Sequence, residues 1–275
     1  MSQFLAVASA AFYGLADFTG GFVAKRIAVW TVTAWSMLIG ASLLIVGLFV
    51  VPADQVTAAD ILWGAVAGVA GLGGLMILYA TLAAGTMSVV APISWATTAI
   101  VPVLFDLGQG STLTSRQWLG IGLGVGAVLL VGMQRGTSSA GPRIVGQAVV
   151  AGALFGLFFI ALSQASSESG LWPLVGARAA SIPLAFLIAF AARALSPPGG
   201  RDLGLLAAIG GLDMAANIAI AIAIQTGPLG VNAVLSSLYP VVTAVAAIVI
   251  LRERPTAVQV AGVGFAVGAI VALAL

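Results

Sequence analysis

The chain has 275 residues, of which 61% are hydrophobic and only 7% are charged, and its formal net charge is +2. A water-soluble domain of this length needs far more charged surface, so the composition excludes an ordinary soluble protein. Cysteine and histidine are absent, which excludes disulfides, thiolate and imidazole chemistry and the usual transition-metal sites. We therefore expect no metal site and no cofactor. We also expect no nucleic-acid partner, because the few basic residues lie scattered between apolar blocks.

These apolar blocks are about 20 residues long, the length that a helix needs to cross a bilayer core of roughly 30 Å. The alternating ten-residue segments of a membrane barrel are absent from the sequence. The first block, 4–23, follows no basic stretch and is too long for a signal peptide, so we expect it to be retained. The sequence thus predicts an all-α membrane protein with ten transmembrane helices. The predicted spans are 3–24, 30–51, 60–82, 86–106, 116–134, 145–165, 171–192, 203–225, 230–251 and 256–275.

The two halves of the chain match when one is shifted by 142 residues, without a gap. The matches include Trp30 with Trp172, Thr114 with Thr256, Gln117 with Gln259, Gly14 with Gly156, Gly68 with Gly210 and Gly120 with Gly262. We predict a first five-helix repeat over 1–134, a polar connecting loop over 135–144 and a second five-helix repeat over 145–275. Since five is odd, the second repeat is inverted relative to the first. Inverted repeats place a substrate site near the membrane midplane and permit alternating access.

Lysine and arginine are distributed unevenly between the two sides. The odd-numbered loops hold Lys25, Arg26, Arg135, Arg143, Arg193, Arg201, Arg252 and Arg254, whereas the even-numbered loops and the termini hold only Arg116. Because positive charge accumulates in cytoplasmic loops, we expect both termini on the outer side of the cell (inner or plasma) membrane.

Three charged residues fall well inside predicted spans, away from their ends, where a charge is costly and needs a reason. Asp213 lies near mid-membrane in the eighth span and Arg178 in the seventh, so the two are candidates for a pair that couples transport or orients a solute carboxylate. A purely structural ion pair, or an arginine that snorkels to the surface, is the alternative. Asp17, in the inner third of the first span, is a candidate gating or proton-sensing group, or merely a polar helix end. Asp60 is expected in a loop.

Aromatic and small hydrogen-bonding side chains recur on five predicted spans. The candidate substrate-binding residues are Tyr79, Ser94, Trp95, Phe155, Phe159, Ser163, Asn217, Asn232, Ser236, Ser237 and Tyr239. Aromatic walls with a few placed polar groups suit a small amphiphilic solute, although each residue taken alone also fits helix packing. Pro92, Pro102 and Pro240 remove backbone donors within spans, so they are candidate hinges or static kinks.

At this point the chain resembles the drug/metabolite transporter superfamily, and its EamA-type ten-span branch in particular. The resemblance rests on the paired five-span units, Tyr13-Gly14, Phe155-Gly156, Arg178, Pro240, Glu253-Arg254, Thr256, Gln259 and Gly262. The first repeat departs from the pattern at Ser36, Thr98 and Ser111-Thr112. The resemblance implies an opening formed by spans 1, 3, 4, 6, 8 and 9 and small metabolites as substrates, with amino-acid export frequent. The chain is also similar to aromatic amino-acid exporters of the YddG type, although members of this branch often have cytoplasmic termini.

The leading functional hypothesis is therefore a non-enzymatic secondary exporter or facilitator of amino acids, including aromatic ones. The expected partners are a small-molecule solute and the lipid bilayer, and the expected assembly is a monomer. A membrane-embedded enzyme acting on lipid is one alternative, disfavoured by the lack of histidine and clustered carboxylates. A channel-like or sensor protein is the other. No P-loop is present, so ATP-driven transport is not supported, and the glycines of 120–126 indicate helix packing rather than a dinucleotide site.

Overall fold

The computed structural model describes residues 1–24, 26–84, 87–132, 141–252 and 255–274, and this part of the chain is helical without any strand. The helices are α1 (Ser2–Val23), α2 (Val29–Val50), α3 (Ala58–Ala84), α4 (Met87–Gly108), α5 (Ser115–Gly132), α6 (Pro142–Ser163), α7 (Trp172–Ala191), α8 (Gly200–Thr226), α9 (Leu229–Ser236), α10 (Tyr239–Ile250) and α11 (Ala257–Ala274). Within these residues ten segments are long and apolar enough to cross a membrane, α9 and α10 together forming the ninth. The predicted all-α membrane fold is confirmed, and the spans begin and end within three residues of expectation.

Several positions used above lie outside the described residues. They are Lys25, Arg135, Glu253, Arg254 and most of the predicted connecting loop 135–144. The repeat boundaries at that loop therefore stay a prediction.

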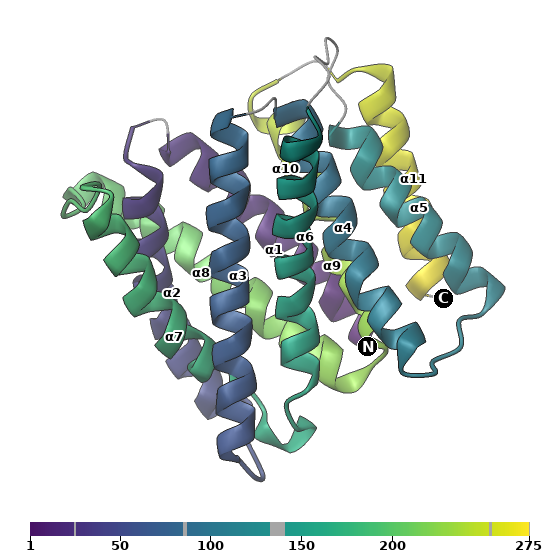
Figure 1. Ribbon diagram of the computed structural model, residues 1–275, viewed down its shortest axis with the longest axis horizontal. Coiled ribbons are helices and arrows are strands. Elements are labelled where there is room, and N and C mark those ends of the chain that lie inside the picture. Colours follow the sequence, from purple (N-terminus) through teal and green to yellow (C-terminus); the bar gives the residue numbers. More distant parts are fainter. Residues whose placement is uncertain (25, 85–86, 133–140, 253–254, 275) are drawn as a thin grey trace.

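The helices form one bundle in which the outermost pairs each draw one member from either half of the chain. Figure 1 shows α2 and α7 at one end of the bundle and α5 and α11 at the opposite end, with the remaining helices between them. The packing repeats between the halves, because α1 packs against α8 as α6 packs against α3. The two chain ends lie on the same side of the bundle, as ten crossings require (Figure 1).

The contact between α5 and α11 shows how the two halves are related. A methyl group placed at Gly120 would meet Leu273 Cγ at 2.5 Å, and one at Gly262 would meet Val131 Cγ2 at 2.7 Å. Since Gly262 and Leu273 stand 142 residues after Gly120 and Val131, these are the same contact made by the two repeats. The start of each helix lies beside the end of the other, so the helices are antiparallel. The two-fold axis that exchanges them is perpendicular to the spans, which is the inverted arrangement predicted.

Glycines permit the closest helix approaches, again at equivalent places. Gly68 of α3 lies against the backbone carbonyl of Ala177 in α7, and Gly210 of α8 lies against that of Ser36 in α2. Neither site has room for a Cβ atom. Without water inside a bilayer, such backbone-to-backbone packing is a main source of helix association. The two repeats are therefore held together by matched glycine contacts.

The matched threonines and glutamines have a local structural role. At the start of α5, Thr114 N donates to Gln117 Oε1 at 2.9 Å and Gln117 N donates to Thr114 Oγ1 at 3.2 Å. Thr256 and Gln259 make the same reciprocal bonds at the start of α11, at 3.0 and 3.3 Å. This capping box satisfies backbone donors that a helix start leaves free. Each repeat thus begins its last span in the same way.

The ninth span is not one helix over 230–251, as the sequence predicts, but two helices. The α9 helix ends at Ser236, and the turn at Ser237 and Leu238 precedes α10. Pro240 stands in the first turn of α10 and has no N–H, so the carbonyl of Ser236 loses its usual helical donor. A helix interrupted inside a membrane exposes backbone groups that a solute or a neighbouring helix can use. The predicted kink at Pro240 is therefore a two-residue interruption between α9 and α10 within one span.

Candidate functional site

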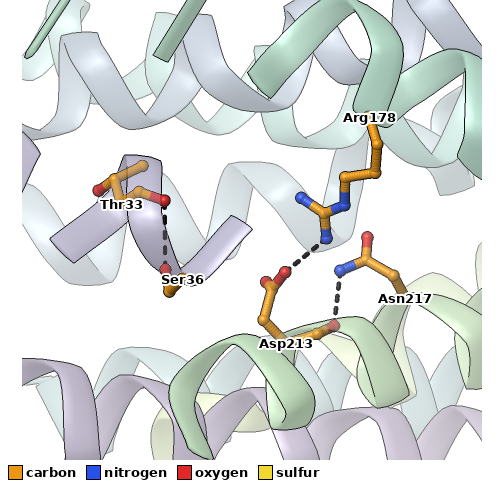
Figure 2. A network of polar contacts seen from close by, with 5 residues as sticks. All are labelled: Thr33, Ser36, Arg178, Asp213 and Asn217. Atoms are coloured by element: carbon orange, nitrogen blue, oxygen red, sulfur yellow. Dashed lines mark hydrogen bonds and ion pairs between the residues drawn. The ribbon is translucent and has the colours of Figure 1, made fainter. Parts of the chain in front are cut away.

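An ion pair joins α7 to the middle of α8. Arg178 Nη2 of α7 is 2.5 Å from Asp213 Oδ2 of α8, and the two side chains point toward one another in Figure 2. Asp213 stands thirteen residues from either end of α8, at the centre of that span. The Arg178 side chain is 11% exposed and that of Asp213 33%, so the carboxylate is the more accessible partner. The sequence-based expectation that these two charges pair is met by this geometry.

Only the second repeat carries this charge pair; the equivalent positions of the first repeat are uncharged. Asn217, one helical turn after Asp213, donates from Nδ2 to the Asp213 backbone carbonyl at 2.7 Å. Ser36, which occupies the position in α2 equivalent to Arg178, donates only to the Thr33 carbonyl of its own helix, at 3.2 Å (Figure 2). Gly71 occupies the position equivalent to Asp213. The second repeat therefore supplies both charges of the pair.

Aromatic rings from both repeats meet close to this level. The rings of Tyr13 in α1 and Tyr239 in α10 have centroids 6.0 Å apart, and Trp95 of α4 contacts Tyr239 edge-on at 6.1 Å. All three rings are only half-buried. Tyr239 begins α10 directly after the break in the ninth span, which places its ring against both neighbours. We call Tyr13, Trp95 and Tyr239 the aromatic cluster.

Asp17 stands beside this cluster. It follows Tyr13 by four residues, so both side chains lie on the same face of α1. The charge of Asp17 is within electrostatic range of Tyr79, Tyr239 and Asp213. Tyr79 of α3 in turn packs edge-on against Trp30 of α2, with ring centroids 5.9 Å apart. Helices α1, α3, α8 and α10 thus direct polar and aromatic groups toward one region.

Some polar atoms of the small polar residues are hydrogen-bonded, and others have no partner. Ser236 shares a hydrogen bond of 3.0 Å with Ser9 of α1, and Asn232 Nδ2 donates to the Ala223 carbonyl at 2.7 Å. Ser94 Oγ, Ser237 Oγ and Asn232 Oδ1 are buried without a partner in the described structure. Buried polar atoms normally have a partner. Ser94 Oγ on α4 and Ser237 Oγ beside the helix interruption thus have no hydrogen-bond partner among the described residues.

Other candidates have packing roles. Phe155 packs beside Leu78 and Ala151, the buried Phe159 contacts Phe158 at 5.5 Å between ring centroids, and Ser163 bonds back to Ile160 at the end of α6. Pro92 and Pro102 lie inside an unbroken α4. Of these five residues, Phe159 belongs to the buried core against which Trp95 and Tyr239 also pack.

Two carboxylates outside the centre are structural. The prediction that Asp60 lies in a loop is wrong. Asp60 lies in the first turn of α3 and is only 3% exposed. Its oxygens accept bonds from Thr57 N at 2.8 Å and from Ser166 N at 2.7 Å, so it caps α3 and ties the α2–α3 and α6–α7 connections together. Asp106 accepts from Gly230 N at 2.6 Å at the start of α9. Both carboxylates thus fix helix ends.

Sequence reasoning missed Tyr13 and Trp30 as site residues. The spacing of Tyr13 four residues before Asp17 was a usable signal, because it places both on one helix face. The position of Trp30 gave no such signal, since its contact with Tyr79 depends on how α2 and α3 pack. A surface hollow of about 470 Å³, lined by Phe190, Ala191, Arg193 and Leu195, lies at the far end of α7 and is not part of this site.

Comparisons with known proteins agree with this architecture. A crystal structure with no more specific title aligns over 98% of this chain and 94% of its own with a TM-score of 0.77; its identity is 16%, so it shows the fold alone. In all, 28 chains of solved structures match, whereas no curated protein does. The model of the EamA-like transporter family matches twice, over residues 1–133 and 143–275. Because these matches span nearly the whole chain, the protein belongs to the EamA-like transporter family, and it is a multi-pass membrane protein that transports a solute.

Proposed function

We propose that this protein is a secondary exporter or facilitator of amino acids, including aromatic ones, of the kind of the YddG exporters. The observation that carries the proposal is that the aromatic cluster lies near the Arg178–Asp213 pair, with Tyr13 within electrostatic range of both charges. Half-buried rings offer an apolar wall for a side chain, and embedded charges and hydroxyls orient the polar end of a small amphiphile. The site draws on α1 and α4 from one repeat and on α7, α8 and α10 from the other.

We further propose transport by alternating access. The contacts of α5 with α11 are exchanged by a two-fold axis in the membrane plane, so each repeat can adopt the arrangement of the other and open the site to the opposite side. The break before Tyr239 gives the ninth span a place to bend. In this scheme Arg178 and Asp213 orient the solute or couple its movement, and Asp17 gates the site. The segment from Ser237 to Pro240 acts as the hinge.

Reconstituted liposomes test this function. We expect saturable flux of phenylalanine, tryptophan, methionine or threonine that a liposome without protein does not show. Flux that rises linearly with concentration would favour a channel, and no flux of any of the four in either direction would contradict amino-acid transport. Incubation with bilayer lipids tests the remaining alternative, because a chemically altered lipid would indicate an enzyme.

A further inference from the structure

Asp17 is a carboxylate inside a span for which the described structure shows neither an ion pair nor a hydrogen bond. Asp213 is held by Arg178, and the carboxylates of Asp60 and Asp106 accept bonds from backbone N–H groups at helix ends. Asp17 is nevertheless in the last third of α1, between the aromatic cluster and the helix end.

The Asp17 side chain is also exposed, although α1 is packed against other helices. Gly20 and Gly21, three and four residues later on the same helix face, have no atom within 4 Å of where a Cβ would stand. Tyr13, four residues earlier, touches Tyr239. Asp17 and the two glycines that follow it are thus uncovered on the face of α1 that continues from the aromatic cluster.

The chemistry around Asp17 suits a cation. An exposed carboxylate attracts an ammonium group and repels an anion, and the faces of tyrosine and tryptophan rings also attract cations. Arg178, the only described cation in this region, is 11% exposed and already engaged by Asp213, so it offers little to a solute carboxylate. Asp17 then binds the solute, in addition to the gating role proposed above, and the role left to Arg178 and Asp213 is that of coupling rather than of holding a solute carboxylate.

We propose that Asp17 is the recognition point for the ammonium group of the solute, and that the substrates are therefore amines with an apolar body, whether or not they carry a carboxylate. The apolar body lies against Tyr13, Trp95 and Tyr239. This inference rests on the proposed function only in taking the central region for the solute site. It extends the substrate class from amino acids to simple aromatic amines.

The test compares two ligands that share a phenyl ring and a two-carbon chain. Phenethylamine carries the ammonium group without a carboxylate, and 3-phenylpropionate carries the carboxylate without an ammonium group. Each is titrated into purified full-length protein, and its Kd is obtained from the thermal shift. We expect phenethylamine to stabilise the wild type saturably and 3-phenylpropionate to have no effect. Equal binding of the two ligands, or binding of the acid alone, or of neither, would overturn the inference.

Variants then locate the interaction. We expect Asp17→Asn to weaken phenethylamine binding by about ten- to a hundredfold, the loss typical of a charge-assisted hydrogen bond. Asp54→Asn, in the exposed α2–α3 connection, is the matched control and should bind as the wild type does. Asp17→Glu keeps the charge and should retain binding, which covers the case that the asparagine variant does not fold. Wild-type affinity in a folded Asp17→Asn variant would contradict the role of Asp17.

These results separate the inference from the proposed function. Asp17-dependent amine binding without amino-acid flux would leave the inference standing and remove the amino-acid proposal. Amino-acid flux with the same KM in the wild type and in Asp17→Asn would do the reverse.

Discussion

Arg178 and Asp213 are charges that the membrane interior tolerates because each one neutralises the other. Removing one partner leaves the remaining charge unpaired in a poorly solvated place, which is more costly than the pair itself is stabilising. Since Asp213 is one-third exposed, water reduces that cost. The pair is therefore a modest source of stability, and its central position gives it a larger part in transport under our proposal.

We predict that Asp213→Asn lowers amino-acid flux in liposomes at least about tenfold, because loss of the charge frees Arg178 to move and changes the polarity of the site. The same variant should lose about 1–3 kcal/mol of stability, the cost of an unmet charged hydrogen bond. Thermal unfolding and flux are measured together, with Asp54→Asn as the control. Unchanged flux in a folded Asp213→Asn protein would remove Asp213 from the site.

The depth of a residue in its span was predictable where a single helix decides it. Hydropathy alone identified Arg178, Asp213 and Asp17 as embedded charges, because no charge belongs in an apolar span without a reason. It misplaced Asp60, whose capping role depends on Thr57 and on a connection from the other repeat. The contact of Tyr13 with Tyr239, more than 200 residues away, depends on tertiary packing that periodicity does not contain.

At the scale of elements, the close helix contacts depend on which glycine faces a neighbour. Gly210 of α8 lies against the Ser36 carbonyl of α2, whereas its neighbour Gly211 has no atom within 4 Å of a Cβ position. The sequence marks both as small residues of one span and cannot tell them apart. It likewise predicts a kink at Pro240, but not that the helix is interrupted at Ser237 and Leu238, between two helices that both contact α1.

We predict opposite effects of the same substitution at these adjacent glycines. Gly210→Ala places a methyl group on backbone atoms that cannot move aside, so α2 and α8 must separate and the melting temperature should fall by several degrees. Gly211→Ala meets nothing and gains up to about 1 kcal/mol of helix propensity, so it should be neutral or slightly stabilising. Thermal unfolding in detergent measures both. An equal loss in the two variants would contradict the close approach of α2 and α8.

The whole molecule combines symmetry of fold with asymmetry of charge. The number of spans and the repeat were predictable, because span length and a shared 142-residue register are properties of the sequence itself. The choice of outer side rests on lysine and arginine alone. We propose that both termini face outward, with the basic connections in the cytoplasm, which is the reverse of the arrangement frequent in this family.

Single cysteines test this orientation, because the natural chain has none. Ser111→Cys lies in the exposed α4–α5 connection and Ser196→Cys in the exposed α7–α8 connection, on opposite sides of the bundle. We predict that a membrane-impermeant maleimide labels Ser111→Cys in intact cells and labels Ser196→Cys only after permeabilisation. The reversed pattern would show that the termini are cytoplasmic.

The central claim is that one site between the repeats opens alternately to the two sides. Counterflow in liposomes measures this most directly: vesicles loaded with unlabelled phenylalanine are diluted into a trace of the labelled amino acid. We expect a transient accumulation of label above equilibrium, because a carrier that returns loaded exchanges one solute for another. Label that enters without an overshoot, at a rate independent of the internal phenylalanine, would contradict alternating access at this site.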